Sequence, residues 1–130
     1  MIKQPSQMET EIRTAMRGGA GSITIRHVFK KEEITAKTRL CAQLTLPPGA
    51  SIGAHQHVAE DELFIITKGS GLLDDGKTKT PVSAGDAILT GNGESHAIAN
   101  TGATDLEIIA VIICYQEAAR LGPNPSPTAS

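Results

Sequence analysis

The sequence predicts an all-β domain, built as an antiparallel sandwich or a closed barrel. Apolar and polar residues alternate along several short segments, which is the period of a strand with one buried face. Glycine, proline, asparagine and aspartate separate these segments at near-regular intervals, and about eight to ten strands fit the pattern. The chain has 130 residues, which suits one domain with a single core.

Residues 1–21 allow two interpretations. Ser6 followed by Glu9 is typical of a capping box, and the apolar positions in Met8–Met16 then form one stripe of a short helix. The same residues could instead form an extended arm. The glycine-rich Arg17–Gly21 lacks the Lys-Ser/Thr ending of a phosphate-binding loop and precedes a strand, so we interpret it as a flexible lead into the barrel.

Two strands are predicted between residues 22 and 46, joined by a charged connection over Lys30–Thr38. The second strand ends at Pro47–Gly49, where two prolines and a glycine stop the sheet. Each strand has one apolar face. These faces comprise Ile23, Ile25, His27 and Phe29 in the first strand, and Leu40, Ala42, Leu44 and Leu46 in the second.

Four turns divide the rest of the chain into further strands. Asp74–Gly76 carries an Asp-Gly pair, a strong hairpin signal. Asn92–Gly93 is a second tight turn, because both residues tolerate a positive φ. Pro81–Gly85 and Thr101–Gly102 supply the other two. We therefore assign residues 22–116 to the barrel.

The segments 63–66 and 108–113 are apolar at nearly every position. A strand that faces water on one side should alternate, so we expect both faces of these strands to be covered. A helix or the N-terminal arm could cover the second face, but we favour a subunit interface and predict a homodimer. The remaining residues, 117–130, form a C-terminal tail of linker-like composition, which we expect to pack on another surface, such as a neighbouring subunit.

Charge and composition exclude several classes of partner. The net charge is −2 and the basic residues are scattered, so the chain lacks the electropositive surface of a nucleic-acid-binding protein. We find neither a signal peptide nor a membrane span, and expect a cytoplasmic protein whose partner is a small molecule. Cys41 and Cys114 match no metal or redox motif, and are expected to be reduced, mostly buried thiols.

Three of the four histidines of the chain belong to one constellation with Glu62. His55 and His57 are two residues apart, so on a strand they point the same way and can reach one ion. A turn then leads to Glu62 on the next strand. His96 follows on a separate strand, and closing the sheet would bring the four side chains together.

These residues resemble the two motifs of the cupin family. The first motif fits Gly49–Gly69 at every spacing, and the second fits Gly85–Asn100, except that Gly91 stands where the family usually has proline. The resemblance covers about residues 40–115 and implies a jelly-roll β-barrel. It also implies one divalent transition metal, bound by His55, His57, Glu62 and His96. Imidazole and carboxylate ligands suit iron, manganese, nickel, zinc or copper and do not choose among them.

We expect the metal to lie at the base of a mostly apolar pocket. Four protein ligands leave open positions on a six-coordinate ion, which is typical of a working site and not of a closed structural one. Few polar groups surround these ligands, so the metal should orient a small chelating ligand. The expected pocket-lining residues are Gly53, Phe64, Ile66, Ile98 and Gln43.

The scarcity of acid–base groups favours a metal-centred reaction, and we expect a dioxygenase-type oxidoreductase that acts on a small chelating metabolite. Glu62 could serve as a base if it leaves the metal. Two alternatives remain: a cupin that binds a small ligand without catalysis, and a metal-dependent isomerase or lyase. His27 could either pack in the core or line the pocket, and Tyr115 could lie at a rim or interface.

Overall fold

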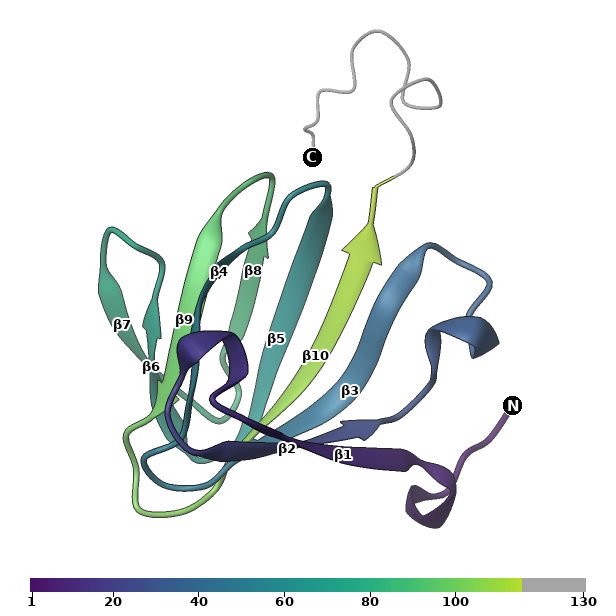
Figure 1. Ribbon diagram of the computed structural model, residues 1–130, viewed down its shortest axis with the longest axis horizontal. Coiled ribbons are helices and arrows are strands. Elements are labelled where there is room, and N and C mark those ends of the chain that lie inside the picture. Colours follow the sequence, from purple (N-terminus) through teal and green to yellow (C-terminus); the bar gives the residue numbers. More distant parts are fainter. Residues whose placement is uncertain (116–130) are drawn as a thin grey trace, which may run out of the picture.

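The computed structural model describes residues 1–115, which form ten strands in two antiparallel sheets (Figure 1). The strands are β1 (Glu9–Thr14), β2 (Ser22–His27), β3 (Thr38–Leu46), β4 (Ser51–Gln56), β5 (Glu60–Lys68), β6 (Ser70–Asp74), β7 (Lys79–Ser83), β8 (Ala87–Gly91), β9 (Ser95–Asn100) and β10 (Leu106–Cys114). One sheet has the order β1-β2-β3-β10-β5-β8, and the other has the order β4-β9-β6-β7. This is the jelly-roll arrangement that the sequence predicts.

The core fills the space between the inner faces of the two sheets. The predicted alternation is confirmed along most of β2 and β3. Their buried residues, which alternate with less buried neighbours, are Ile23, Ile25, Ala42, Leu44 and Leu46, whereas His27 and Leu40 are only partly buried. β5 and β10 contribute most of the other side chains of the interior, because buried residues alternate along each strand. The fully buried core side chains include Ile23, Ile25, Leu44, Leu46, Ile52, Phe64, Ile66, Ile98, Leu106 and Ile108.

The N-terminal segment is extended, and the short helix considered for Met8–Met16 does not form. β1 instead pairs antiparallel with β2, from Glu9 opposite His27 to Thr14 opposite Ser22. The only helical turns in the segment are the 3₁₀ turns η1 (Pro5–Gln7) and η2 (Met16–Gly18). A helix of two turns is marginal by itself, whereas the open edge of β2 offers hydrogen bonds along six residues.

The predicted hairpin turns are present. The Asp75–Gly76 pair lies between β6 and β7, and the two strands pair from Ser70 opposite Ser83 to Asp74 opposite Lys79. Asn92–Gly93 connects β8 to β9, with a φ of 57° at Asn92. A third 3₁₀ turn, η3 (Lys31–Glu33), lies in the charged connection between β2 and β3.

The outer face of the six-stranded sheet carries an apolar patch on β5, β8 and β10 that is partly open to solvent. Ile65, Leu89 and Ile113 are 43%, 66% and 48% exposed, so within residues 1–115 neither a helix nor the N-terminal arm closes over them. Cys41 and Cys114 are free thiols of intermediate burial. No helix among the described residues is long and apolar enough to cross a membrane. The predicted C-terminal tail, 117–130, lies outside the described residues.

Candidate metal centre

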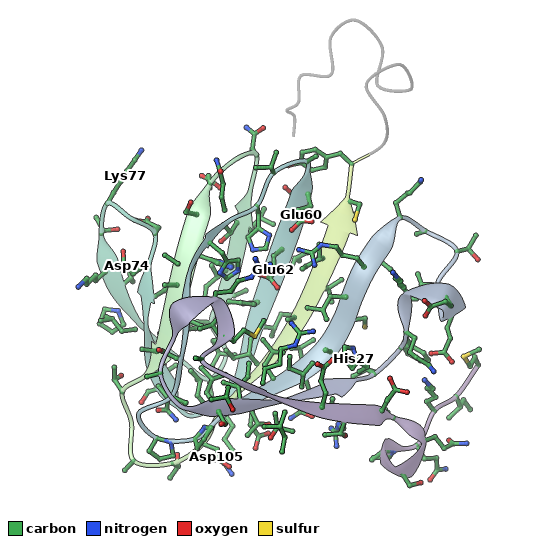
Figure 2. The ribbon with its side chains drawn as sticks, viewed as in Figure 1. His27, Glu60, Glu62, Asp74, Lys77 and Asp105 are labelled. Carbon is green, nitrogen blue, oxygen red and sulfur yellow. The ribbon has the colours of Figure 1, made fainter. Side chains whose placement is uncertain are left out.

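The four predicted ligands meet in one cluster between the two sheets, with one ligand atom of each lying within 4.8 Å of the others. His55 is on β4 opposite His96 on β9, and His57 directly follows β4. Glu62 reaches them from β5, in the other sheet; Figure 2 shows it beside the imidazole rings in the interior. The cluster therefore depends on the closure of the two sheets, as the sequence predicts.

Each imidazole is held by a hydrogen bond at Nδ1. The Nδ1 atoms of His57 and His55 lie 2.5 Å from Oε2 of Glu60 and 2.8 Å from the carbonyl oxygen of Gly53. A carboxylate and a carbonyl only accept, so the two Nδ1 atoms carry hydrogens, and in the neutral form of each ring Nε2 keeps a lone pair for a metal. Nδ1 of His96 lies 2.9 Å from the hydroxyl of Thr90, which permits the same tautomer. The orienting hydrogen bonds typical of metal-bound histidines are thus present.

The centre of the cluster suits a cation. Nε2 of His96 lies 3.0 Å from Nε2 of His57 and 3.1 Å from Nε2 of His55. Two nitrogens that both present lone pairs repel each other at this distance unless a positive charge lies between them. Oε1 of Glu62 is also buried, and no hydrogen-bond donor among the described residues reaches it. The residues present therefore fit a divalent metal.

The surroundings of the cluster lower the pKa of its carboxylate and of one of its imidazoles. Burial by itself raises the pKa of Glu62, but interactions with the surrounding histidines, His55 and His96 first among them, outweigh this effect and lower the pKa to about 2. The pKa of His96 is lowered, chiefly because burial disfavours its charged form. Both shifts favour the protonation states that metal ligation requires.

A second ion pair supports the cluster from outside. Arg39 donates two hydrogen bonds of 2.7 Å to the two oxygens of Glu60, which in turn holds His57. The guanidinium is the main reason that the pKa of Glu60 is lowered. This chain of contacts fixes the orientation of the His57 ring. No motif in the sequence indicates this role for Arg39 or Glu60.

A cavity of about 130 Å³ opens onto His55, His57 and Glu62. Of the expected lining residues, Phe64 forms part of its wall. The structure also settles the alternative left open for His27, which lines the cavity and contacts Glu11 through Nε2 at 2.6 Å. The other side chains of the wall are Arg13, Met16, Arg17, Ile25, Arg39, Leu40, Leu44, Ile52 and Ile112.

The remaining expected lining residues lie elsewhere. Ile66 and Ile98 are buried in the core and do not border this cavity. The prediction for Gln43 is wrong, because it points to the outer face of β3, where its amide donates to Glu107 at 2.9 Å. Gly53 leaves no open space either, since a Cβ there would lie 1.9 Å from the carbonyl oxygen of Arg17.

The loop before His96 has a steric reason for its unusual glycine. A Cβ at Gly91 would lie 1.8 Å from Oδ1 of Asp61, and the Gly91 N–H donates to Glu94 at 3.1 Å. Proline would lose this hydrogen bond and collide with Asp61. The hydroxyl of Tyr115 accepts a hydrogen bond of 3.0 Å from the N–H of Asn92 and holds the loop from outside the cavity. Tyr115 therefore lies at the rim of the sheet.

Comparison with known proteins agrees with this architecture. The chain is 44% identical to an oxalate-binding protein of Thermotoga maritima over 113 residues, which are 87% of this chain and 93% of that protein. A crystal structure of a predicted oxalate decarboxylase from Thermotoga maritima superposes with a TM-score of 0.84 at 44% identity, covering 88% of this chain and 99% of that one. Auxin-binding protein 1 of Arabidopsis thaliana is 30% identical over 72% of this chain and 46% of its own length. Residues 42–112 match the family model of the cupin domain, and the chain therefore belongs to the cupin family.

Proposed function

We propose that this protein binds a small chelating carboxylate of the oxalate class at one divalent transition metal. The ligands would be His55, His57, Glu62 and His96. When bound, the metal would act as a Lewis acid toward the oxygens of the ligand. The donor set leaves iron, manganese, nickel, zinc and copper as candidates.

The spacing of the ligand atoms is the observation that carries this proposal. Atoms bonded to one ion at about 2.1 Å lie at most about 4.2 Å apart. Oε1 of Glu62 lies 2.9 Å from Nε2 of His57 and of His96, and 3.9 Å from Nε2 of His55. All three separations would allow these atoms to hold one ion.

The same spacing bears on the kind of ligand. Nε2 of His57 and Nε2 of His96 lie 3.0 Å apart, so these two rings could also hold the same ion. Four protein ligands would leave free positions on a six-coordinate ion, which would suit one molecule with two oxygens. The cavity of about 130 Å³ is below the usual range for drug-sized ligands, which favours a compound of a few heavy atoms. The name of the Thermotoga maritima relative agrees with this chemistry.

Calorimetry on metal-loaded and chelator-stripped protein tests the proposal. Oxalate should bind the loaded protein more tightly than acetate by roughly 10²-fold, because the second oxygen of a chelator binds at high effective concentration. Stripped protein should bind oxalate only weakly. Equal affinity of loaded and stripped protein, or no preference for oxalate over acetate, would contradict the assignment.

A dioxygenase-type oxidoreductase is the second candidate, and the state of the acid–base groups in the cavity favours it. Glu62 is a poor base at a pKa of about 2, and His27 already contacts Glu11. A reaction centred on the metal requires few acid–base groups from the protein, whereas an isomerase or lyase needs a free base. Oxygen uptake after reconstitution with iron(II), with small chelating acids as substrates, distinguishes the enzyme from a binding protein.

We also propose that two copies of the chain associate through the outer face of the six-stranded sheet. Ile65, Leu89 and Ile113 project from neighbouring strands and remain substantially exposed. A single apolar face that contacts its own copy forms a closed, two-fold dimer. Leu89→Asp should then convert the dimer into a monomer of unchanged fold, as measured by light scattering coupled to size exclusion. Ile12→Asp, on the distant edge strand β1, is the matched control. A dimer that survives Leu89→Asp and dissociates with Ile12→Asp would place the interface at β1.

A further inference from the structure

Two arginine residues of the N-terminal segment border the metal cavity. Arg13 lies on β1 and Arg17 in η2, and both line the same space as His55 and Glu62. We propose that Arg17 is an anion-binding residue, which contacts the outer, negatively charged oxygens of a dianion chelated at the metal. This inference rests on the proposed function and names the charge that the ligand carries.

The contacts of the three lining arginines single out Arg17. Arg39 is bound to Glu60, and Nε of Arg13 lies 2.9 Å from Oε1 of Glu11. Among residues 1–115, no carboxylate lies within ion-pairing distance of Arg17. Arg17 is exposed, and its guanidinium, with donors arranged to bind two oxygens at once, is therefore available to a ligand at the open side of the cavity.

The charge balance of the cavity agrees with a dianion. A divalent metal with the carboxylate of Glu62 leaves one net positive charge, and Arg17 adds a second. The positive charge of Arg13 is offset by Glu11, and that of Arg39 by Glu60. A ligand with two negative charges would neutralise the site, whereas a monoanion would leave one charge uncompensated.

The backbone fixes Arg17 against the strand that carries the metal ligands. Ala15 and Arg17 both adopt left-handed conformations, with φ of 53° and 54°. Such strained residues persist only where their surroundings hold them, and they concentrate at functional sites. The carbonyl of Arg17 occupies the space that a side chain at Gly53 would take, which brings η2 directly onto β4.

Two hydrogen bonds hold the end of this segment. The N–H of Ser51 donates to the carbonyl of Ala20 at 2.9 Å, and the Ser51 hydroxyl accepts from the N–H of Ala20 at 2.8 Å. Ser51 is the first residue of β4, so the turn with Arg17 and the strand with His55 form one connected unit.

Comparison of oxalate with glycolate tests the role of Arg17. Both ligands chelate a metal through two oxygens, but oxalate is a dianion with two outer carboxylate oxygens, whereas glycolate is a monoanion with one. In metal-loaded full-length protein, Arg17→Gln should weaken oxalate binding by roughly 10–100-fold, the usual effect of losing a charge-assisted hydrogen bond. Glycolate affinity should change by less than about threefold on the same basis. Calorimetry measures both.

Two further variants complete the experiment. Arg17→Lys keeps the positive charge but loses the paired donors of the guanidinium, and it should restore part of the oxalate affinity. Lysine and glutamine both have a long side chain, as arginine does, so neither substitution removes the side chain from the strained position. Lys77→Gln removes one positive charge at the distant β6–β7 turn and should change neither affinity (Figure 2). Unchanged oxalate affinity in Arg17→Gln, or equal losses for both ligands, would overturn the role of Arg17 alone. Wild-type protein that binds neither chelator would overturn the proposed function as well.

Discussion

Glu62→Ala should abolish stoichiometric metal binding. The substitution would remove the only carboxylate among the four proposed ligands and leave the three imidazoles by themselves. His57→Ala should act in the same way, because Nε2 of His57 lies 2.9 Å from Oε1 of Glu62 at the centre of the cluster. We expect affinity to fall by more than about 100-fold in each variant, beyond the range of about 10–100-fold typical of residues that only orient a ligand.

Elemental analysis of untagged protein, purified without chelators or a metal-affinity column, measures this effect. Gln56→Ala is the matched control, because Gln56 lies between the two histidines on the chain but is exposed and contacts the carbonyl of Gly93. The control should retain full metal content. Full occupancy in both Glu62→Ala and His57→Ala would refute the four-ligand assignment, provided that circular dichroism shows the barrel intact.

The cluster of four candidate metal ligands could be predicted because it depends on local sequence and strand geometry. Two histidines at a spacing of two residues share one side of an extended segment, and Glu62 opens the next strand after a short turn. Only His96 is distant from the other three residues in sequence. The closure of the strands into a barrel places it beside them. The jelly roll itself was predictable from the same alternation.

The cavity wall was harder to predict, because it depends on contacts between distant segments. β1 has a weak strand pattern and forms by pairing with β2, so the sequence did not reveal that it carries Arg13 to the cavity. Arg17 reaches the wall because Gly53 lets η2 approach β4, a contact between residues 36 positions apart. Gln43 is a different error: strict alternation with the buried Ala42 and Leu44 already places it on the outer face.

Phe64→Ala should produce the largest loss of stability among substitutions near the site. The ring is 2% exposed and stacks on the imidazole of His96, with centroids 4.8 Å apart and an interplanar angle of 14°. Removing a buried phenylalanine ring lowers the free energy of unfolding by about 3–5 kcal/mol, because contacts are lost and a cavity remains. Urea denaturation of the metal-free protein measures this loss without the added stability that bound metal gives the folded state.

A second core substitution separates packing from support of the metal ligand. Ile66 lies two residues further along β5, on the same buried face and 1% exposed, but it does not line the metal cavity. Ile66→Ala should cost about 2–5 kcal/mol and leave metal affinity unchanged. Phe64→Ala should also weaken metal binding, since the His96 ring loses the flat surface that restrains its orientation. Equal metal affinity in the two variants would mean that Phe64 stabilises only the core, and that the Thr90 hydroxyl at 2.9 Å is enough to orient His96.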